Sequence, residues 1–189
     1  MYKLCKTEQS ARRQRELEQG LLMAMCSHRY EEISVSDLCD QMSIPRKSFY
    51  RYFSSKDGAL HALIDHTLLE YEGYFPEYSK ADKRSVHKDL ERFFQYWQDK
   101  RLLLDALDRS GLSGVLVMRA VDHALSDLGV PIRFLPQNEH HVRQHATMFG
   151  VCGLLSMVMN WHKTGFATSV SEMAGIAVQL VTKPLFSEG

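Results

Sequence analysis

Residues 34–60 read SVSDLCDQMSIPRKSFYRYFSSKDGAL, and this stretch decides the fold of the chain. Ser34 stands three positions before Asp37, which is the spacing of a capping box, so a helix is predicted to start there. The Ser-Ile-Pro sequence at 43–45 interrupts that helix, because the residue before a proline avoids the helical region. A new helix can begin at Pro45, since the missing N–H of proline costs nothing in a first helical turn. The stretch therefore predicts a helix-turn-helix.

The second helix of this pair carries a basic face. Residues 43–56 include no acidic side chain and four basic ones, which are Arg46, Lys47, Arg51 and Lys56. Phe49 and Phe53 repeat at the spacing of one helix face and are expected to be buried. A helix of this kind enters the DNA major groove, where its first residues read base edges and its neighbours hold phosphates. We expect Arg46 and Lys47 to meet bases, since arginine can donate two parallel hydrogen bonds to guanine, and Ser48 to contact a base or a phosphate.

The segment from Leu17 to Leu60 resembles the amino-terminal domain of the tetracycline-repressor-like (TetR) family of bacterial transcription regulators. Family members show an apolar residue, Tyr, any residue, His or Tyr, Phe, and then Lys. Here these places are held by Phe49, Tyr50, Arg51, Tyr52, Phe53 and Lys56. The preceding SVSDLCDQMSI fits the family's Thr-Val stretch followed by Ile-Ala and Ala-Gly-Val-Ser. The chain departs from the pattern at the turn glycine, the capping serine and a helix-ending glycine, which are replaced by Ser43, Pro45 and Arg29.

The resemblance extends the set of expected DNA contacts. Tyr50, Tyr52 and Lys56 match family positions that touch the DNA backbone, and Lys56 also lies at a helix start whose N–H groups favour phosphate. Ser36, near the start of the preceding helix, is expected to add a phosphate contact. The predicted DNA-binding set is Ser36, Pro45, Arg46, Lys47, Ser48, Tyr50, Arg51, Tyr52 and Lys56.

Composition bounds the rest of the chain. Of 189 residues, 44% are apolar, which is enough for a packed core, and 23 basic side chains balance 23 acidic ones, so net charge alone does not indicate nucleic acid. The four cysteines form no C-x-x-C pair, which is typical of a reducing compartment. The amino terminus has no apolar core like that of a signal peptide, and the longest charge-free stretch, between Arg143 and Lys163, is too polar for a membrane span. We expect a soluble cytoplasmic protein.

The regular segments all have a helical period, which predicts an all-α fold of about nine helices. Residues 1–56 are expected to form the helix-turn-helix DNA-binding domain, and residues 57–189 a helical-bundle regulatory and dimerisation domain. Besides Ser34, two more serines stand at capping-box spacing: Ser54 before Asp57 and Ser169 before Glu172.

The segment from Glu139 to Lys163 is apolar on all sides between Ala146 and Trp161, so every side of it must be covered. The same helix of a second subunit would cover the outer face, and the last helix would complete a four-helix interface with twofold symmetry. The alternative is a helix buried in its own core; the resemblance favours the dimer, because family members pair through their last two long helices. The expected interface residues are Val151, Leu154, Leu155, Val158, Val170, Met173, Ala177 and Leu180. A dimer with two reading helices implies an inverted-repeat operator.

The resemblance also implies a small-molecule effector held among the helices of the larger domain. Apolar and aromatic side chains with a few polar groups line such sites. The candidates are Tyr74, Phe93, Trp97, Met118, Met148, Phe149 and Cys152. The competing interpretation is that these residues are ordinary core, as aromatic residues at helical spacing usually are.

The leading hypothesis is a repressor controlled by a ligand. An alternative is a TetR-like interaction module of coactivator type, which acts through a protein partner. His141 and His145 are four apart on one helix, which is the spacing that lets two imidazoles share a metal, and His123 or His162 could be a further ligand. The favoured interpretation is that these histidines face solvent, so no metal or cofactor is expected. Nucleophile motifs, glycine-rich phosphate loops and credibly placed carboxylate pairs are missing from the sequence, so an enzyme is not expected.

Overall fold

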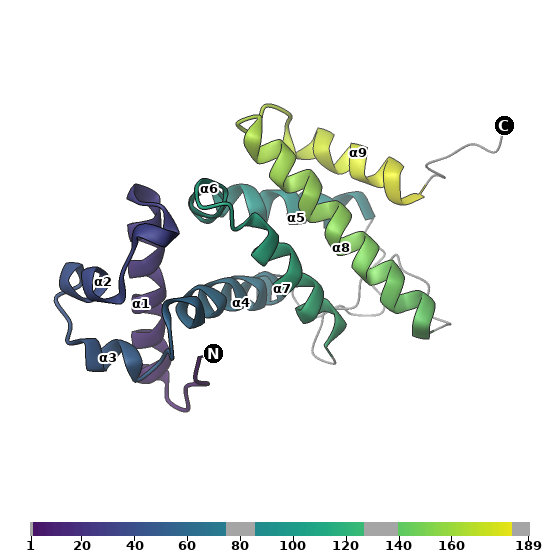
Figure 1. Cartoon of the computed structure of the whole chain (residues 1–189). Coiled ribbons are helices and arrows are strands. Elements are labelled where there is room, and N and C mark those ends of the chain that lie inside the picture. Colours follow the sequence, from purple (N-terminus) through teal and green to yellow (C-terminus); the bar gives the residue numbers. More distant parts are fainter. Residues whose placement is uncertain (1, 75–85, 127–139, 183–189) are drawn as a thin grey trace. The chain divides into compact units, whose positions relative to one another are not determined.

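The structure is a computed structural model that describes residues 2–74, 86–126 and 140–182, with side chains described for 2–71, 86–126 and 142–182. Within these ranges the chain is helical (Figure 1). The helices are α1 (Glu8–Ser27), the 3-10 helix η1 (Tyr30–Glu32), α2 (Val35–Gln41), α3 (Arg46–Tyr50), α4 (Lys56–Tyr74), α5 (Val86–Asp99), α6 (Arg101–Arg109), α7 (Ser113–Leu125), α8 (His140–Lys163) and α9 (Val170–Thr182). The predicted all-α class is confirmed. The breaks expected at Pro76, 80–85 and 129–136 lie outside the described residues.

The chain divides into two compact units. Unit 1 consists of Met1–Glu70 and Leu102–Arg119, and unit 2 of Tyr71–Arg101 and Ala120–Gly189. Unit 1 thus holds α1 to α3, most of α4 and α6, and the first half of α7. This division differs from the expected one at residue 56, because the helix-turn-helix shares its compact unit with later helices. Residue 56 stays a prediction of where the DNA-binding function ends.

Unit 1 is organised around α1. Thr7 caps this helix, since its side chain accepts a hydrogen bond from the N–H of Ser10. The apolar face predicted from the sequence is buried as expected, by Leu17, Leu21, Leu22 and Met25. Gly20 allows α1 to approach the end of α2, because a Cβ at this position would lie 2.3 Å from the Sδ of Met42.

Two of the three predicted capping boxes are present. The hydroxyl of Ser34 accepts from the N–H of Asp37 at 3.1 Å, and the Asp37 carboxylate accepts in return from the Ser34 N–H. Ser169 and Glu172 repeat this pair at the start of α9. The prediction for Ser54 is wrong: α4 begins one residue later than expected, so Ser55 takes the cap position and accepts from the N–H of Gly58 at 3.1 Å.

Unit 2 is built on α5, which packs against α8 and α9 (Figure 1). Leu90, Phe94 and Trp97 of α5 are buried, and the Phe94 ring meets the Trp161 ring edge-on with centroids 5.7 Å apart. The Trp161 indole N–H donates to the Thr168 carbonyl at 2.8 Å, which closes the connection from α8 to α9. None of the described helices is long and apolar enough to cross a membrane.

Candidate nucleic-acid interface

The turn between α2 and α3 is made by a serine in a left-handed conformation. Ser43 has φ 53°, its N–H donates to the Asp40 carbonyl at 3.0 Å, and the N–H of Ile44 donates to the Cys39 carbonyl at 2.9 Å. These two bonds form a Schellman motif, in which glycine is the usual residue. The same motif ends α6, where Gly111 has φ 66°. Serine therefore holds a position that glycine fills elsewhere in this chain.

Helix α3 is anchored by aromatic packing. Pro45 is extended and stands just before the helix, so Arg46 rather than Pro45 is the first helical residue. Phe49 and Phe53 are 0% and 1% exposed, with ring centroids 5.2 Å apart, which confirms that both belong to the core. The Phe49 ring also meets the exposed Tyr50 ring edge-on at 5.6 Å. The opposite face of α3 is thereby fixed toward solvent.

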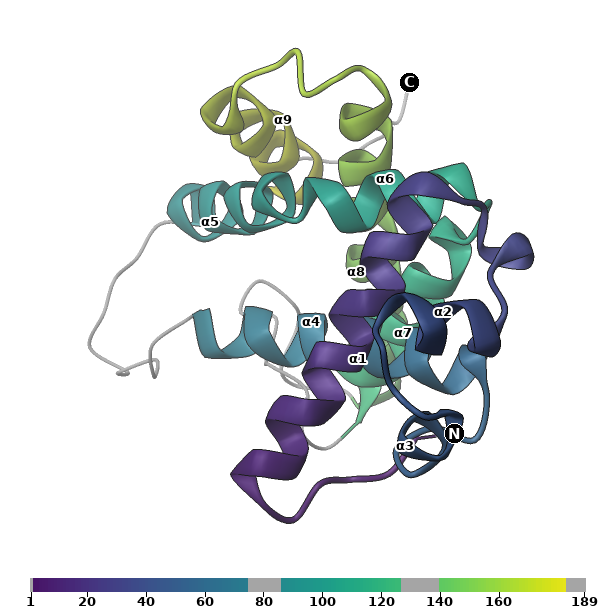
Figure 2. The same ribbon diagram turned by 90° about the vertical axis from the view of Figure 1, so that its left-hand side faces the viewer.

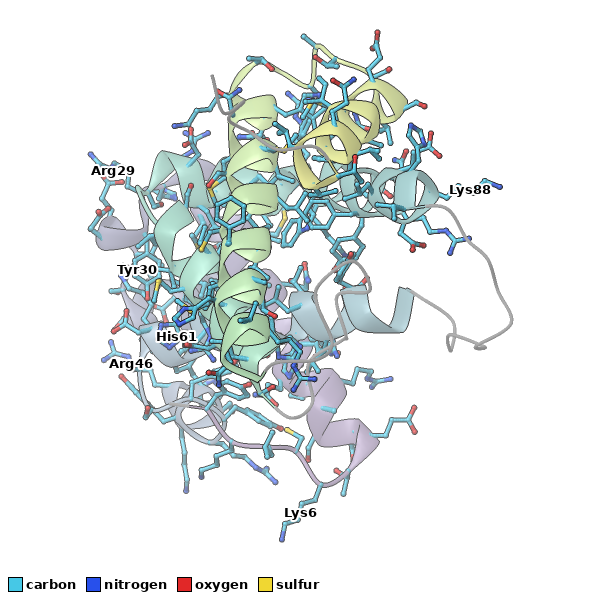
Figure 3. The ribbon with its side chains drawn as sticks, turned by 90° about the vertical axis from the view of Figure 1, so that its right-hand side faces the viewer. Lys6, Arg29, Tyr30, Arg46, His61 and Lys88 are labelled. Carbon is cyan, nitrogen blue, oxygen red and sulfur yellow. The ribbon has the colours of Figure 1, made fainter. Side chains whose placement is uncertain are left out.

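The outward face of α3 carries the positive charge of the reading head, which is the DNA-binding domain expected over residues 1–56. Arg46, Lys47 and Arg51 are exposed, and Tyr50 is 51% exposed. Figure 3 shows the Arg46 side chain extending away from the ribbon. Ser36 and Ser48 are half-buried. The arrangement presents three cations and a phenol on one short helix, a surface that suits a polyanion.

Arg46 also influences the cap of α2. Hydrogen bonds from Ser34 hold the pKa of the Asp37 carboxyl below its usual range, and the positive charge of Arg46 adds to this effect. The carboxylate in the first turn of α2 thus lies within the electrostatic influence of the start of α3.

Lys56 and Tyr52 are placed differently from what the resemblance implies. The Lys56 ammonium donates to the carbonyls of Tyr30 at 2.5 Å and Ile33 at 2.6 Å and lies 4.1 Å from the centroid of the Tyr30 ring. The Tyr52 side chain is buried, at 8% exposed, while its carbonyl accepts from the N–H of Lys3. Both side chains serve the packing of unit 1, so this geometry does not favour the backbone contacts expected of them.

Tyr30 links Lys56 to the rest of unit 1. Its hydroxyl donates to the Asp57 carboxylate at 2.7 Å, and burial together with this hydrogen bond raises the pKa of the phenol. Its backbone N–H donates to the Ser110 hydroxyl at 3.0 Å. The start of α4 and the end of α6 are therefore both attached to η1, immediately before the helix-turn-helix.

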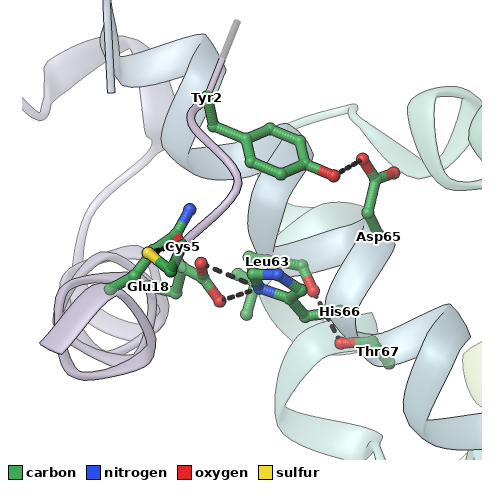
Figure 4. A network of polar contacts seen from close by, with 8 residues as sticks. Tyr2, Cys5, Glu18, Leu63, Asp65, His66 and Thr67 are labelled. Atoms are coloured by element: carbon green, nitrogen blue, oxygen red, sulfur yellow. Dashed lines mark hydrogen bonds and ion pairs between the residues drawn. The ribbon is translucent and has the colours of Figure 1, made fainter. Parts of the chain in front are cut away.

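Sequence reasoning missed the role of the first residues. Tyr2 forms an antiparallel bridge with Phe53, and its hydroxyl donates to the Asp65 carboxylate at 2.7 Å (Figure 4). Arg119 forms a two-point ion pair with the same carboxylate. These partners of Tyr2 lie far along the chain, and no local motif at residue 2 signals them.

A second polar contact links α1 to α4. Glu18 is 2% exposed, and both its oxygens lie 2.8–2.9 Å from Nδ1 of His66 (Figure 4). Nearby, the Cys5 thiol donates to the Gln14 amide oxygen at 2.8 Å. The periodic apolar pattern of α1 could not indicate these contacts, because Gln14 and Glu18 look in sequence like residues of a solvated face.

In unit 2 the expected dimer residues lie mostly inside. Leu154, Leu155, Val158, Met173 and Ala177 are at most 9% exposed, so they pack within the chain and cannot form an outer face. Val151 and Val170 are half-buried, and Leu180 is 43% exposed. This burial does not favour an interface role for the five residues, and the predicted interface stays a prediction. A helix that is apolar all round carries no pattern that tells which side faces the core.

The expected ligand residues are spread over several environments. Phe93 and Trp97 are buried in α5, whereas Met148 and Phe149 are 41% and 70% exposed. Cys152 is half-buried, Met118 is 61% exposed and belongs to unit 1, and the side chain of Tyr74 lies outside the described residues. Among the described side chains no group of three His, Cys, Asp or Glu residues could hold a metal. The side chain of His141 is outside that part of the chain.

Comparison with known proteins shows what the chain is similar to. The chain is 37% identical over 70 residues to the HTH-type transcriptional regulator EthR of Mycolicibacterium smegmatis; the match covers 35% of this chain, which thus spans about a third (32%) of that relative. The dihydroxyacetone kinase operon activator DhaS superposes with a TM-score of 0.56 at 15% identity, over 89% of this chain and 93% of DhaS. The chain has a TetR-like regulator fold. A structure of the fatty acid degradation regulator FadR from Bacillus halodurans agrees, with a TM-score of 0.54 at 13% identity over 96% of this chain and 98% of FadR.

The TetR-like resemblance seen in residues 17–60 is therefore confirmed. No protein-family model matches the chain. The similar proteins are named as regulators.

Proposed function

We propose that this TetR-like protein is a dimeric transcription regulator that reads an inverted-repeat DNA operator with α3 and answers to a small molecule bound in unit 2. The observation that carries the proposal is the outward face of α3, where Arg46, Lys47 and Arg51 stand on a helix locked from behind by Phe49 and Phe53. Arg46, in the first turn, reads a base edge, and Lys47 and Arg51 neutralise phosphates.

The dimer is proposed through the outer faces of α8 and α9. Met148, Phe149 and Gly153 are exposed on α8, with Phe149 and Gly153 four residues apart on one side of the helix. Ile176 and Leu180 are exposed on α9 at the same spacing. Phe149 is 70% exposed, which leaves a large ring in water unless a partner covers it. This face differs from the one expected from the sequence but uses the same two helices. Two copies paired in this way would carry two reading heads.

The effector is proposed to bind beside Trp97. The Trp97 indole N–H is buried and has no hydrogen-bond partner among the described residues, although buried donors are nearly always paired. The rings of Phe93 and Tyr96 lie 6.5 Å and 5.6 Å from it, centroid to centroid. An apolar molecule carrying one acceptor oxygen would satisfy this donor within an aromatic environment. We propose that its binding releases the operator, as in a repressor.

A second candidate is a regulator that acts through a protein partner. Two expected phosphate contacts, Tyr52 and Lys56, are used inside the head, which leaves a smaller set of free cations on the DNA side. DhaS, one of the similar folds, is named as an operon activator. In this case α3 would bind DNA weakly, and a partner would supply the rest of the affinity.

The two candidate functions can be distinguished by fluorescence anisotropy at several salt concentrations. The protein is titrated onto the DNA that flanks its own gene and onto a random duplex. The regulator that reads DNA directly binds one duplex more tightly than a random one, with affinity that falls steeply as salt rises. Replacing Arg46 with alanine should cost about 1–3 kcal/mol on the selected duplex and much less on the random one. Equal losses on both duplexes would contradict Arg46 as a base reader.

A further inference from the structure

The first residues of the chain form a strap that lies against the end of the reading helix. The strap is defined as residues 2–6. The bridge between Tyr2 and Phe53 and the 3.0 Å hydrogen bond from the Lys3 N–H to the Tyr52 carbonyl attach it directly after α3. In Figure 2 the strap is the purple trace that precedes α1. The strap therefore shares the DNA-facing end of unit 1.

The side chains of the strap divide into an inner and an outer set. Tyr2 and Cys5 are half-buried and donate hydrogen bonds to Asp65 and Gln14. Lys3, Leu4 and Lys6 point outward, and Leu4 is 86% exposed. The inner residues of the strap hold the fold, and two of its three outer residues are cations, so its outer side is suited to bind a second partner.

The strap continues the basic surface of α3. Arg51 at the end of α3 is exposed, Tyr52 follows it and is paired with Lys3, and the strap has no acidic residue. The next acidic side chain along the chain is Glu8, which begins α1. Cations that lie beside a DNA-reading helix meet the phosphates next to those that the helix holds.

We propose that the strap is a second DNA-binding element, in which Lys3 and Lys6 neutralise backbone phosphates beyond those reached by α3. This inference rests on the proposed function, because it extends the same interface. Tyr2 is a positioning residue: its hydroxyl fixes the strap to Asp65 of α4, and Arg119 of α7 holds that carboxylate from the other side.

The test compares two charge-matched double variants by anisotropy on a fluorescent random-sequence 30-bp duplex and on the duplex that flanks the gene. One replaces Lys3 and Lys6 with glutamine, and the control replaces Arg29 and Arg109 with glutamine. Arg29 follows the carboxyl end of α1, about 30 Å from Lys6 by the length of a 20-residue helix. Arg109 precedes Ser110, which pairs with the N–H of Tyr30. Figure 3 shows Lys6 and Arg29 well separated.

If the strap binds phosphates, the slope of log affinity against log salt becomes shallower in the lysine variant by about 1.8 for each bound subunit, at about 0.9 per phosphate contact, and stays unchanged in the control. Tyr2→Phe should keep the slope but weaken binding severalfold, because the lysines remain and must be ordered on binding. Equal melting temperatures of the two double variants and the wild type establish that their folding is intact, and Tyr2→Phe is measured well below its own melting temperature.

A wild-type slope in the lysine variant, with a loss of affinity in Arg46→Ala, overturns the strap proposal and leaves the proposed function standing. If the wild-type protein shows no salt-dependent binding to either duplex, both the strap proposal and the proposed function are overturned. A slope that changes equally in the lysine variant and in the control also overturns the strap proposal, since net charge rather than position would then be responsible.

Discussion

The Nζ of Lys56 lies 4.1 Å above the centroid of the Tyr30 ring and 2.5 Å from the Tyr30 carbonyl oxygen, so one side chain holds the 3-10 helix η1 against the start of α4. Lys56→Met keeps the aliphatic stem but removes the charge and its hydrogen bonds. We expect the free energy of unfolding to fall by about 2 kcal/mol, because hydrogen bonds to charged groups contribute more than neutral ones. Urea denaturation followed by circular dichroism measures the change.

Lys47→Met is the matched control for Lys56, since Lys47 is exposed on α3. Its unfolding free energy should stay within about 0.5 kcal/mol of the wild type, while its DNA affinity drops. If instead Lys56→Met is as stable as the wild type and loses only DNA affinity, Lys56 is a phosphate contact and not an anchor.

Ser43 holds the left-handed turn at a cost that glycine would avoid. A side chain in the left-handed conformation costs about 1–2 kcal/mol, which glycine avoids. Glycine also raises the conformational entropy of the unfolded chain, which offsets part of this gain, so Ser43→Gly should stabilise the protein by about 0.5–1 kcal/mol. Gly111→Ser, at the equivalent turn after α6, should destabilise it by a similar amount. Thermal unfolding of both variants and of Ser43→Ala, which keeps the Cβ and should be neutral, checks the assignment.

Tyr2 makes stability depend on alkaline pH. Burial and the hydrogen bond to Asp65 raise the pKa of Tyr2 to about 12, above its ordinary value of 10.0. Because the pKa is raised in the folded state, the contribution of the neutral Tyr2 hydroxyl to the free energy of unfolding is complete below pH 10. It is lost as the pH rises toward 12, where the folded state also ionises. The difference in unfolding free energy between the wild type and Tyr2→Phe should therefore shrink over this interval. A difference that stays constant from pH 9 to 12 would show that the hydroxyl is not buried.

Phe149 on the outer face of α8 should control assembly. Phe149→Arg places a charge where the proposed dimer buries a ring, so the variant should sediment as a folded monomer in analytical ultracentrifugation. Met23→Arg is the control, since Met23 is 57% exposed on α1 of unit 1 and should leave a dimer. Leu155→Arg, in contrast, should unfold the protein, because Leu155 is 3% exposed. A wild-type monomer would contradict the proposed interface.

Trp97 and Trp161 differ in whether the indole N–H is paired, which gives a test of the effector site. A thermal-shift screen of apolar carboxylic acids and esters should find compounds that stabilise the protein. A ligand present at 100 times its Kd raises the free energy of unfolding by about 2.7 kcal/mol. Trp97→Phe removes the unpaired donor and should abolish that shift. Trp161→Phe removes an N–H already bonded to Thr168 and should keep it. Equal shifts in both variants would place the ligand elsewhere.

The head was predictable from sequence because its signals are local. The Ser34–Asp37 cap, the proline after Ile44 and the spacing of Phe49 and Phe53 each act over a few residues, and each appears in the structure. Ser54 was misplaced by one position, since two adjacent serines offer the same cap and only the packing of α4 decides between them.

The remaining contacts depend on partners far along the chain. Lys56 was expected to face DNA because its sequence position matches that role, but carbonyls 23 and 26 residues away hold its ammonium. Phe149 was expected in the ligand site and Leu155 in the dimer interface, yet Phe149 is exposed and Leu155 is buried. On a helix segment without a polar side, only tertiary packing sets which side chain meets solvent. Tyr2 carried no signal, because Asp65 is 63 residues distant.

Unit 1 is assembled from two stretches separated by a segment that belongs to unit 2. A fragment that ends at residue 70 would lack Ser110 and Arg119, and with them one hydrogen-bond partner of Tyr30 and the ion-pair partner of Asp65. The reading head is therefore not an excisable module: such a fragment should fold only when a peptide covering residues 102–119 is supplied separately. Grafting this head onto another protein would require a permuted chain that joins the two stretches, rather than a simple transfer of the first domain.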